Sequence, residues 1–235
     1  RELTISNGLS QNMVSSILQD HNGYMWFGTK DGLNRFDGYS CKIYKSDLFD
    51  STSISDNHIT CLYEDKDNNL WVGSRLGGLN LYVPGADFFI KVIDSRFEGK
   101  SILINSISGN FQDGIWISTR DGQCFGLDIS NSKDAKSLKV KFLKVAGLGT
   151  PDKSKVLNVY LDQHKLLWIA TIKGLQIYNL KNNQLDATGL AFSTTKVFDR
   201  NNAIDKIVYS PFRESIYETV EDEVGNIWLA GDAGL

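Results

Sequence analysis

Cysteine, proline, methionine and histidine are all scarce in this sequence of 235 residues, which holds three, three, two and three of them. The cysteines form an odd, sparse set on different predicted strands: Cys41, Cys61 and Cys124. Such a set is typical of buried thiols and not of a disulfide framework, so it leaves the redox compartment open. The histidines fall in three separate loops: His21, His58 and His164. They lack the spacing of zinc ligands, so no zinc site is expected.

Strong charge and long apolar runs are absent as well. The net charge is -3 at pH 7 and the pI is about 5.6, with no clustered Lys/Arg run, so a nucleic-acid groove is not expected. No stretch of about eighteen apolar residues occurs, so the sequence predicts no membrane-spanning helix within these residues. Periodicity of about 3.6 residues is also missing over any useful length, which argues against helical repeats.

What the sequence does have is one motif written five times around its tryptophans. The tryptophans occupy the same position of the motif: Trp26, Trp71, Trp116, Trp168 and Trp228. Six residues before them stand Asp20, Asp65, Asn110, Asp162 and Asp222. Six residues after them stand Gly32, Gly77, Gly122, Gly174 and Gly234. Because these are turn residues, a turn is predicted on either side of every tryptophan.

Each tryptophan is expected to lie on the second of four short strands. The first strand opens twelve residues upstream with a branched apolar residue: Val14, Ile59, Ile104, Val156 and Ile216. A third strand is predicted after the glycine turn, as at 33–36, and a fourth as at 41–44. The tryptophans are 45, 45, 52 and 60 residues apart. A four-stranded antiparallel unit that recurs about every 40–50 residues is the signature of a β-propeller blade.

We therefore expect an all-β fold, a partial β-propeller over residues 1–235 with about four and a half blades. The expected parts are a closing strand and lead-in loop at 1–9, blades at 10–54, 55–99, 100–148 and 149–210, and an incomplete blade at 211–235. Residues 1–5 would complete the last blade of a closed ring. Seven blades are favoured for that ring, and five are the alternative. An array that ends inside a blade should expose apolar faces.

The residues after each tryptophan suit a blade core. Small side chains stand two residues after it, at Gly28, Gly73, Ser118, Ala170 and Ala230. They are expected to leave room for the indole of a neighbouring sheet. Hydroxyl residues come next, at Thr29, Ser74, Thr119 and Thr171, where they can hydrogen-bond within the turn. The motif is therefore mostly scaffold.

The two rims of such a propeller differ in charge. The rim of the first-to-second turns carries Asp20, Asp65, Asp67, Asp113, Asp162, Glu221, Asp222 and Glu223. The rim of the second-to-third turns carries Lys30, Arg75, Arg120 and Lys173. This basic rim is a candidate site for a carboxylated or sulfated sugar, because guanidinium groups bind such anions through paired hydrogen bonds. The alternative is that these are ordinary solvated turn residues.

The longest predicted connections are 147–155 and 181–214, and insertions on a rim often carry function. The prolines all fall outside the predicted strands, at Pro84, Pro151 and Pro211. The longer connection holds Phe192, Tyr209, Phe212 and Arg213. These residues could form a stacking platform for a sugar ring or a contact with a neighbouring propeller, and packing onto the rim is the alternative. Tyr209 and Arg213 therefore join the four basic residues as candidate ligand-binding residues.

Catalysis and metal binding find little support. The run Asp-Lys-Asp-Asn-Asn at 65–69 looks like a calcium loop but lacks its glycine, so a plain Asx turn is predicted. No nucleophile motif accompanies the histidines, so no catalytic triad is expected. A propeller enzyme would place His or acidic groups at the central channel, where the presumed inner strands offer Ser16, Cys61, Ser106, Asn158 and Glu218. This row favours scaffold or binding, while a lyase or lactonase and a protein-interaction platform stay open as alternatives.

Residues 14–33 carry a specific resemblance. Their pattern Val-x-x-Ile-x-x-Asp-x-x-Gly-x-x-Trp-x-Gly-Thr-x-x-Gly-Leu resembles the two-component regulator propeller repeat, and the other four copies follow it. The departures are Asn110 for Asp, a Gly114 displaced by one position, an extra Gly78, and Lys165 where Gly is expected. They put local turn shapes in question and not the fold. The opening Leu-Thr-Ile-Ser-Asn-Gly-Leu-Ser at 3–10 is similar to the start of the sensor region in hybrid two-component systems that regulate glycan use in gut bacteria.

In that family two seven-bladed propellers and an immunoglobulin-like domain lie in the periplasm, ahead of a membrane helix, a histidine kinase and a response regulator. The resemblance implies a non-catalytic sensor in the periplasmic part of an inner-membrane protein, without cofactor or metal. Its ligand would be an oligosaccharide or a related small molecule. Its partners would be the rest of the propeller, a second propeller and a second copy, because the family's sensors dimerise. Nucleic acid is not an implied partner, and the membrane would be reached only through other segments.

Overall fold

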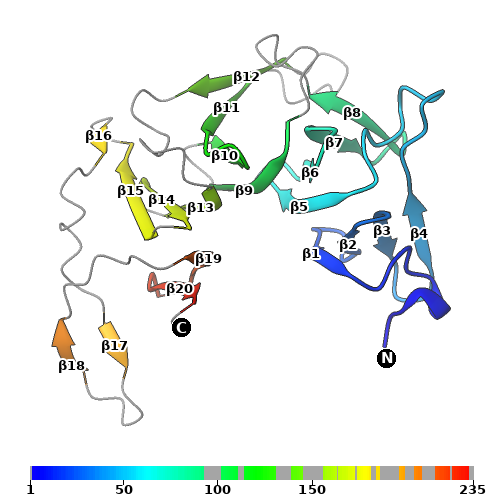
Figure 1. Ribbon diagram of the computed structural model, residues 1–235. Helices are drawn as coiled ribbons and strands as arrows, with labels where there is room; N and C mark the ends of the chain where they lie inside the picture. Colours follow the sequence, from blue (N-terminus) through cyan, green and yellow to red (C-terminus); the bar gives the residue numbers. More distant parts are fainter. Residues whose placement is uncertain are drawn as a thin grey trace.

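The computed structural model of this chain describes residues 2–92, 102–110, 114–130, 139–144, 156–162, 164–172, 174–180, 184–185, 196–198, 204–207, 215–222 and 224–232. Within these residues, five antiparallel sheets that each hold one tryptophan follow one another along an arc (Figure 1). This arrangement confirms the all-β propeller fold predicted from the repeat.

The first four sheets are four-stranded meanders in which each strand pairs with the next one in sequence. Blade 1 holds β1 (Val14–Gln19), β2 (Met25–Thr29), β3 (Gly32–Phe36) and β4 (Cys41–Tyr44). Blade 2 holds β5 (Ile59–Glu64), β6 (Leu70–Ser74), β7 (Leu79–Val83) and β8 (Phe88–Val92). Blade 3 holds β9 (Ile104–Asn110), β10 (Gly114–Thr119), β11 (Cys124–Ser130) and β12 (Lys139–Lys144). Blade 4 holds β13 (Val156–Leu161), β14 (Leu166–Thr171), β15 (Gly174–Asn179) and β16 (Gln184–Leu185).

Blade 5 is described by β19 (Ile216–Glu221) and β20 (Ile227–Gly231). Between blades 4 and 5, β17 (Lys196–Phe198) and β18 (Ile204–Ile207) form a separate two-stranded sheet in what the sequence predicted to be a plain connection. At the other end, Ile5–Asn7 form a 3-10 helix, η1. The strand expected over residues 1–5 is therefore not formed in the described structure. A strand needs a partner, and the closing role of this segment stays a prediction.

The core lies between blades and not within a single one. The innermost strands β1, β5, β9, β13 and β19 contact one another in sequence, each against the next blade. Trp26 packs with Ile59 and Leu62 of blade 2, and Trp71 packs with Ile104 and Ile107 of blade 3. In blades 1 and 2 the tryptophan therefore seals the gap to the following blade.

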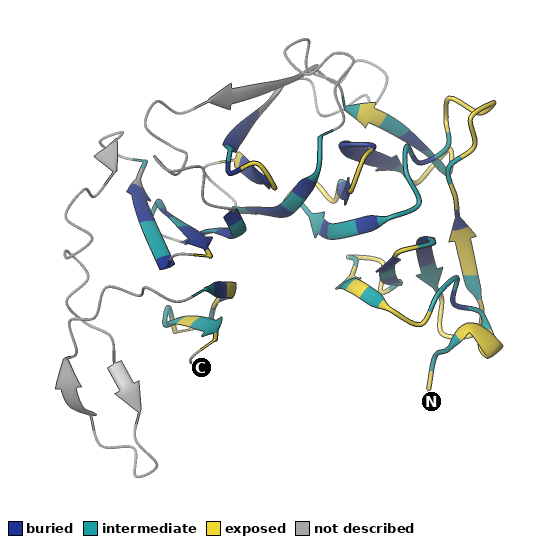
Figure 2. Cartoon of the chain, viewed as in Figure 1, coloured by how far each residue is buried: buried dark blue, intermediate teal, exposed yellow. Residues whose placement is uncertain are grey.

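Burial falls off at the two ends of the arc (Figure 2). Trp71 has no exposed surface, whereas the equivalent Trp228 of blade 5 is 40% exposed. On the opposite face of the array, Leu62 is 9% exposed while the equivalent Ile17 of blade 1 is 61% exposed. These two side chains lack a neighbouring blade among the described residues, and the exposed apolar faces agree with the sequence expectation.

Each inner strand carries a β-bulge at its second residue. The register of all five first-to-second strand pairs shifts there, at Ser15, Thr60, Asn105, Leu157 and Tyr217. In the first three repeats the bulged side chain donates a hydrogen bond to the first inner-strand residue of the next blade. Ser15 Oγ donates to the Ile59 carbonyl at 2.6 Å, and Thr60 Oγ1 donates to the Ile104 carbonyl at 2.6 Å. The bulge therefore adds a polar seam to the apolar contact between blades.

At Gly28 and Gly73 the space beside the small residue is not filled by an indole, so the prediction was wrong for these two positions. A Cβ on Gly28 would lie 2.7 Å from Cγ2 of Ile59. A Cβ on Gly73 would overlap Sγ of Cys61 and lie 2.9 Å from Cγ2 of Ile104. The room is taken by the branched residue that opens the next inner strand, because that strand crosses directly over the second strand of the preceding blade. The predicted hydroxyl contacts are confirmed: Thr29, Ser74, Thr119 and Thr171 each donate to a backbone carbonyl in the turn that follows.

All three cysteines are free, as predicted. Cys124 is buried, and Cys41 and Cys61 are partly buried. Burial raises the pKa of the Cys61 and Cys124 thiols to about 12, so both stay protonated at neutral pH and are poor nucleophiles.

Candidate functional site

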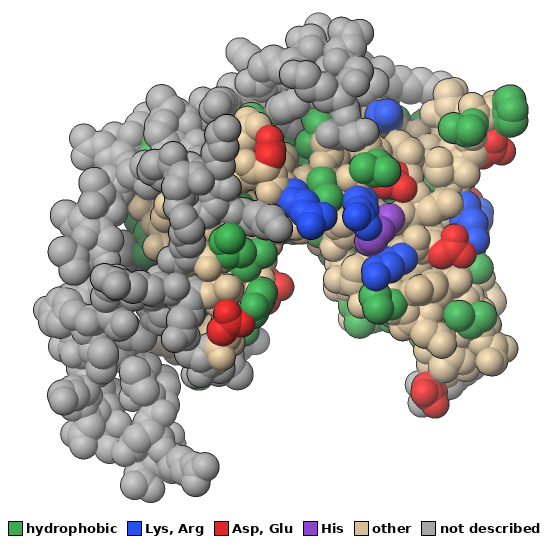
Figure 3. Space-filling view, in the orientation of Figure 1, with side chains coloured by type: hydrophobic (Ala, Val, Ile, Leu, Met, Phe, Trp, Pro, Cys, Tyr) green, Lys and Arg blue, Asp and Glu red, His purple; other side chains and the backbone are tan. Residues whose placement is uncertain are grey.

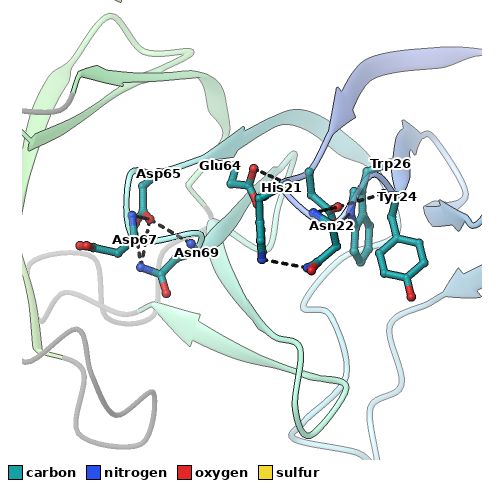
Figure 4. Close-up of polar contacts among 9 residues, drawn as sticks. His21, Asn22, Tyr24, Trp26, Glu64, Asp65, Asp67 and Asn69 are labelled. Carbon is teal, nitrogen blue, oxygen red and sulfur yellow. Dashed lines mark hydrogen bonds and ion pairs between the residues drawn. The ribbon is translucent and has the colours of Figure 1, made fainter.

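The turn between the first and second strands of a blade is organised by one carboxylate (Figure 4). In blade 2, Oδ1 of Asp65 accepts the N–H groups of Asp67 and Asn69, both at 2.9 Å, and Oδ2 accepts the indole N–H of Trp71 at 2.8 Å. The equivalent indole bonds in the other blades, to Asp20, Asp162 and Asp222, measure 2.8, 2.9 and 3.0 Å. The Asx turn predicted at Asp65 is confirmed, and both carboxylate oxygens are engaged in it.

The third repeat departs from this arrangement, as its sequence does. Where the other repeats have Asp, this one has Asn110, and the buried Nε1 of Trp116 has no hydrogen-bond partner in the described structure. The left-handed turn residue also moves, from the fourth position of the turn, as at Gly23 (φ 84°), to Gly114 (φ 87°). Lys165 occupies the fourth position in blade 4 with φ 69°, a conformation that glycine adopts far more easily.

On this acidic rim, blades 1 and 2 are joined through His21 and Glu64. The His21 backbone N–H donates to Glu64 Oε2 at 2.9 Å, and the His21 ring Nδ1 lies 2.6 Å from Oε1 (Figure 4). Asn22 contacts the other ring nitrogen at 2.9 Å. The contact ties blades 1 and 2 together at this rim.

A second polar network, which sequence reasoning missed, closes the outer edge between blades 1 and 2. Asp87 Oδ1 accepts the hydroxyls of Tyr44 and Tyr82 at 2.6 and 2.7 Å, and Oδ2 pairs with Lys42. Partial burial works against ionisation, yet the hydrogen bonds from Lys42, Tyr44 and Tyr82 lower the pKa of Asp87 to about 2. Arg35 Nη1 donates to Tyr82 Oη at 2.7 Å and completes the network.

The row predicted to face a central channel contacts a neighbouring blade instead in four of its five positions. Cys61 packs into the core between blades 2 and 3. Ser106 Oγ accepts the Val159 N–H at 2.9 Å, and Asn158 Nδ2 donates to Glu218 Oε1 at 2.9 Å. The reason is geometric: strand side chains project from the faces of a sheet, and in a propeller those faces meet the neighbouring blades. Burial of its carboxyl raises the pKa of Glu218, the one acidic member of the row.

The basic rim keeps its character in the structure. Lys30, Arg75 and Arg120 are exposed on the second-to-third turns of blades 1, 2 and 3. Figure 3 shows Lys and Arg side chains gathered with a histidine on this face of the arc. Within the described residues, no ion pair involves Lys30, Arg75 or Arg120. Three other residues predicted for the site, Lys173, Tyr209 and Arg213, lie outside the described residues, as do Phe192, Phe212, Asp113, Glu223 and Gly234.

His58 is the residue of this rim that sequence reasoning did not select. The segment 56–58 lies between two turns and binds both. The Gly32 N–H donates to the Asn57 carbonyl at 2.8 Å, and the Arg75 N–H donates to the His58 carbonyl at 2.9 Å. Partial burial and the charge of Arg75 lower the pKa of His58, Asp56 raises it, and Lys30 lowers it again. No signal in the sequence singles out His58, because the two basic turns meet beside it only in the folded chain.

Within the part of the chain that the structure describes, no helix is long and apolar enough to cross a membrane. The same residues hold no group of three His, Cys, Asp or Glu side chains arranged to bind a metal ion.

The repeated Asp–Trp turn, the bulged inner strand and the cores between sheets define a β-propeller built from tryptophan-centred repeats. Residues 8–31 and 53–75 match the family model described as the two component regulator propeller. Two segments of the chain, one in blade 1 and one in blade 2, therefore match the repeat of the two-component regulator propeller.

Two solved extracellular domains from B. thetaiotaomicron, described as parts of hybrid two component systems, share the fold. The one from BT4673 has a TM-score of 0.66 at 20% identity, covering 94% of this chain and 26% of that one. The one from BT3049 has a TM-score of 0.53 at 24% identity, covering 98% of this chain and 40% of that one. A gluconolactonase from Xanthomonas campestris also shares it, with a TM-score of 0.59 at 9% identity over 92% of this chain and 68% of that one.

In sequence, the chain is similar to Histidine kinase P4 of Formosa agariphila. The two are 53% identical over 55 residues, which is 23% of this chain and 4% of that protein. The chain thus spans 4% of the length of this kinase, and 26% and 40% of the two extracellular domains.

Proposed function

We propose that this chain is an extracytoplasmic sensor module of a hybrid two-component signalling protein. It binds a glycan-derived ligand in the periplasm and signals to a histidine kinase outside these residues. The observation that carries the proposal is the match of blades 1 and 2 to the two component regulator propeller repeat. The extracellular domains that share its fold support the same role.

The ligand site is proposed on the basic rim. Lys30, Arg75 and Arg120 stand at equivalent turns of three successive blades, exposed and without ion pairs in the described structure. Guanidinium and ammonium groups in such a row suit a carboxylated or sulfated sugar. Lys173, Tyr209 and Arg213 stay predictions for the same site. The partners proposed within the whole protein are the remainder of a seven-bladed propeller, a second propeller and a second copy of the chain.

An enzyme of the lactonase or lyase type is the second candidate, because propeller enzymes share this fold. The observation that favours it is Glu218, an inner-strand carboxyl with a raised pKa that is hydrogen-bonded to Asn158. Against it, the remaining described positions of that row are small and polar, and the two buried thiols are protonated at neutral pH. A sensor therefore accounts for more of the molecule.

The test is a thermal-shift titration of the full chain against neutral and acidic oligosaccharides, since a ligand that binds only the folded state raises its apparent stability. We expect a saturable shift with at least one sugar, and no shift with glycerol at equal concentration. If an acidic sugar is preferred, Arg75→Gln and Arg120→Gln should each weaken it. A folded protein that responds to no sugar would contradict the glycan sensor and favour the protein-interaction alternative. Turnover of a sugar lactone that is lost in Glu218→Gln would favour the enzyme.

A further inference from the structure

We propose that Lys30, His58 and Arg75 form a binding site for one anionic group, a carboxylate or a sulfate, and that His58 becomes protonated when the anion binds. The inference deepens the proposed function and rests on its ligand-binding role, because it names the ligand chemistry at the basic rim and the pH dependence of binding. It places the centre of the site between blades 1 and 2.

The frame of this site is built from backbone hydrogen bonds. The Gly32 N–H donates to the Asn57 carbonyl and so holds the turn that carries Lys30. The Arg75 N–H donates to the His58 carbonyl and so holds the turn that carries Arg75. The turns of two blades are thereby fixed to the backbone of Asn57 and His58. Because these turns are already held by hydrogen bonds, binding a ligand there requires little further loss of backbone conformational entropy.

The fold itself does not require a histidine at this place. His58 directly precedes the first residue of its inner strand, and the equivalent residues in the other described repeats are Met13, Leu103 and Ser215. In blade 3 the Leu103 carbonyl accepts the Arg120 N–H at 3.1 Å, which is the same backbone bond that His58 makes. An apolar residue can thus serve the scaffold, so the imidazole is free for another role.

Lys30 and Arg75 bring positive charge close to His58. Lys30 and Arg75 have no ion pair within the described residues. The nearby carboxylates are engaged: Asp31 pairs with Lys45 at 2.8 Å, and Asp56 accepts the N–H of Leu76 at 2.7 Å and that of His58 at 3.2 Å. A carboxylate or sulfate can accept charge-assisted hydrogen bonds from Arg75 and Lys30 together.

The expected protonation of His58 on binding follows from the same surrounding charges. Without an anion, partial burial and the charges of Arg75 and Lys30 lower the pKa of His58, and Asp56 raises it. A bound anion offsets both cations and shifts the pKa of His58 upward, so binding takes up a proton. Affinity should therefore rise as the pH falls below the ordinary histidine range.

The experiment is calorimetric titration of the full chain at pH values of about 7.5, 6.5 and 5.5 and at constant ionic strength. The probes are a sulfated disaccharide, a uronic-acid disaccharide, their neutral counterpart and inorganic sulfate. The variants are His58→Gln, Arg75→Gln and, as a matched control on the opposite rim, Lys66→Gln. Circular dichroism melts check that each variant is folded.

For the wild-type chain and for Lys66→Gln, we expect affinity for the anionic sugars to rise about three- to tenfold from pH 7.5 to pH 5.5, since one pKa unit corresponds to about tenfold. His58→Gln should bind at the pH 7.5 level without the rise, and Arg75→Gln should lose about tenfold or more at every pH. A rise that persists in His58→Gln, or pH-independent binding by the wild type, would overturn the inference.

The probes separate this inference from the proposed function. If the neutral disaccharide binds as well as its anionic counterparts, the glycan sensor stands and the anion site is refuted. If inorganic sulfate binds with the expected pH dependence while no sugar binds, the anion site stands and the glycan sensor is refuted. If no probe binds the folded chain, both are contradicted.

Discussion

The indole Nε1 of Trp71 donates a 2.8 Å hydrogen bond to Oδ2 of Asp65, six residues earlier in the chain. The other oxygen of the same carboxylate closes the turn between β5 and β6. One side chain thus fixes both the reversal of the chain and the orientation of the ring that seals blade 2 against blade 3. The repeat keeps its aspartate and its tryptophan at this spacing because each positions the other.

The third repeat offers a direct test of that relationship. Replacing Asn110 with Asp should supply the missing acceptor to the buried Nε1 of Trp116. We expect the free energy of unfolding to rise by about 0.5–1.5 kcal/mol, the usual net value of a hydrogen bond. Urea denaturation measures it. Asp65→Asn is the reverse control and should lower stability by a similar amount. If Asp65→Asn lowers the free energy of unfolding while Asn110→Asp leaves it unchanged, the third repeat does not use the carboxylate–indole bond of the other repeats.

The sequence was sufficient for the fold because its signals are local and repeated. Turn residues at fixed distances from each tryptophan, and a branched residue twelve positions before it, predicted the strands and their order. The bond between Trp71 and Asp65 was not predicted, because it forms only when two strands are paired. The partner of Gly28 was predicted wrongly for a related reason: which side chain crosses a glycine depends on how two blades pack, and no local pattern encodes that.

The candidate site was predicted only in part. Lys30 and Arg75 were placed on one rim from the topology alone, and the structure keeps them there. His58 was set aside because it had no ligand spacing along the chain. Its neighbours are brought to it by hydrogen bonds from Gly32 and Arg75, which lie 26 residues before it and 17 after it in the sequence. Contacts between segments this far apart are a property of the folded chain.

Gly28 should tolerate no side chain unless Ile59 becomes smaller. An added Cβ would lie 2.7 Å from Ile59 Cγ2, so Gly28→Ala should lower the free energy of unfolding by about 1–3 kcal/mol through overpacking. Ile59→Ala, which removes the Cγ2 that the added Cβ would meet, should alone cost about 2–5 kcal/mol. In the double variant the losses should not add, and a double-mutant cycle measures the coupling. Additive losses would mean that the strain is relieved elsewhere.

Asp87 should make the chain sensitive to acid. Its pKa is lowered in the folded state from 3.8 to about 2, so its stabilising contribution is fully present above pH 4–5 and is lost as the pH falls towards about 2. Asp87→Asn should lower stability at neutral pH by roughly 1–3 kcal/mol, because it leaves the two tyrosine hydroxyls and Lys42 with a weaker acceptor. Denaturation between about pH 2 and pH 6 should show a smaller pH dependence in the variant. Asp67→Asn is the control, since that carboxylate is exposed on the turn between β5 and β6. Parallel pH profiles of wild type and Asp87→Asn would contradict the assignment.

Replacing Lys165 with glycine should stabilise the folded chain. Lys165 occupies the turn position that Gly23 and Gly225 fill in other repeats, and its φ of 69° is costly for a residue with a side chain. We expect Lys165→Gly to raise the free energy of unfolding by about 1 kcal/mol, the left-handed cost less the extra entropy that glycine loses on folding. Asn68 holds the same turn position in blade 2 with φ 64°, and asparagine tolerates this region, so Asn68→Gly should change stability little. Thermal unfolding of both variants beside the wild type makes the comparison. If Lys165→Gly lowers the free energy of unfolding while Asn68→Gly leaves it unchanged, the expectation is wrong. The contacts of the lysine side chain then stabilise the fold by more than its left-handed backbone destabilises it.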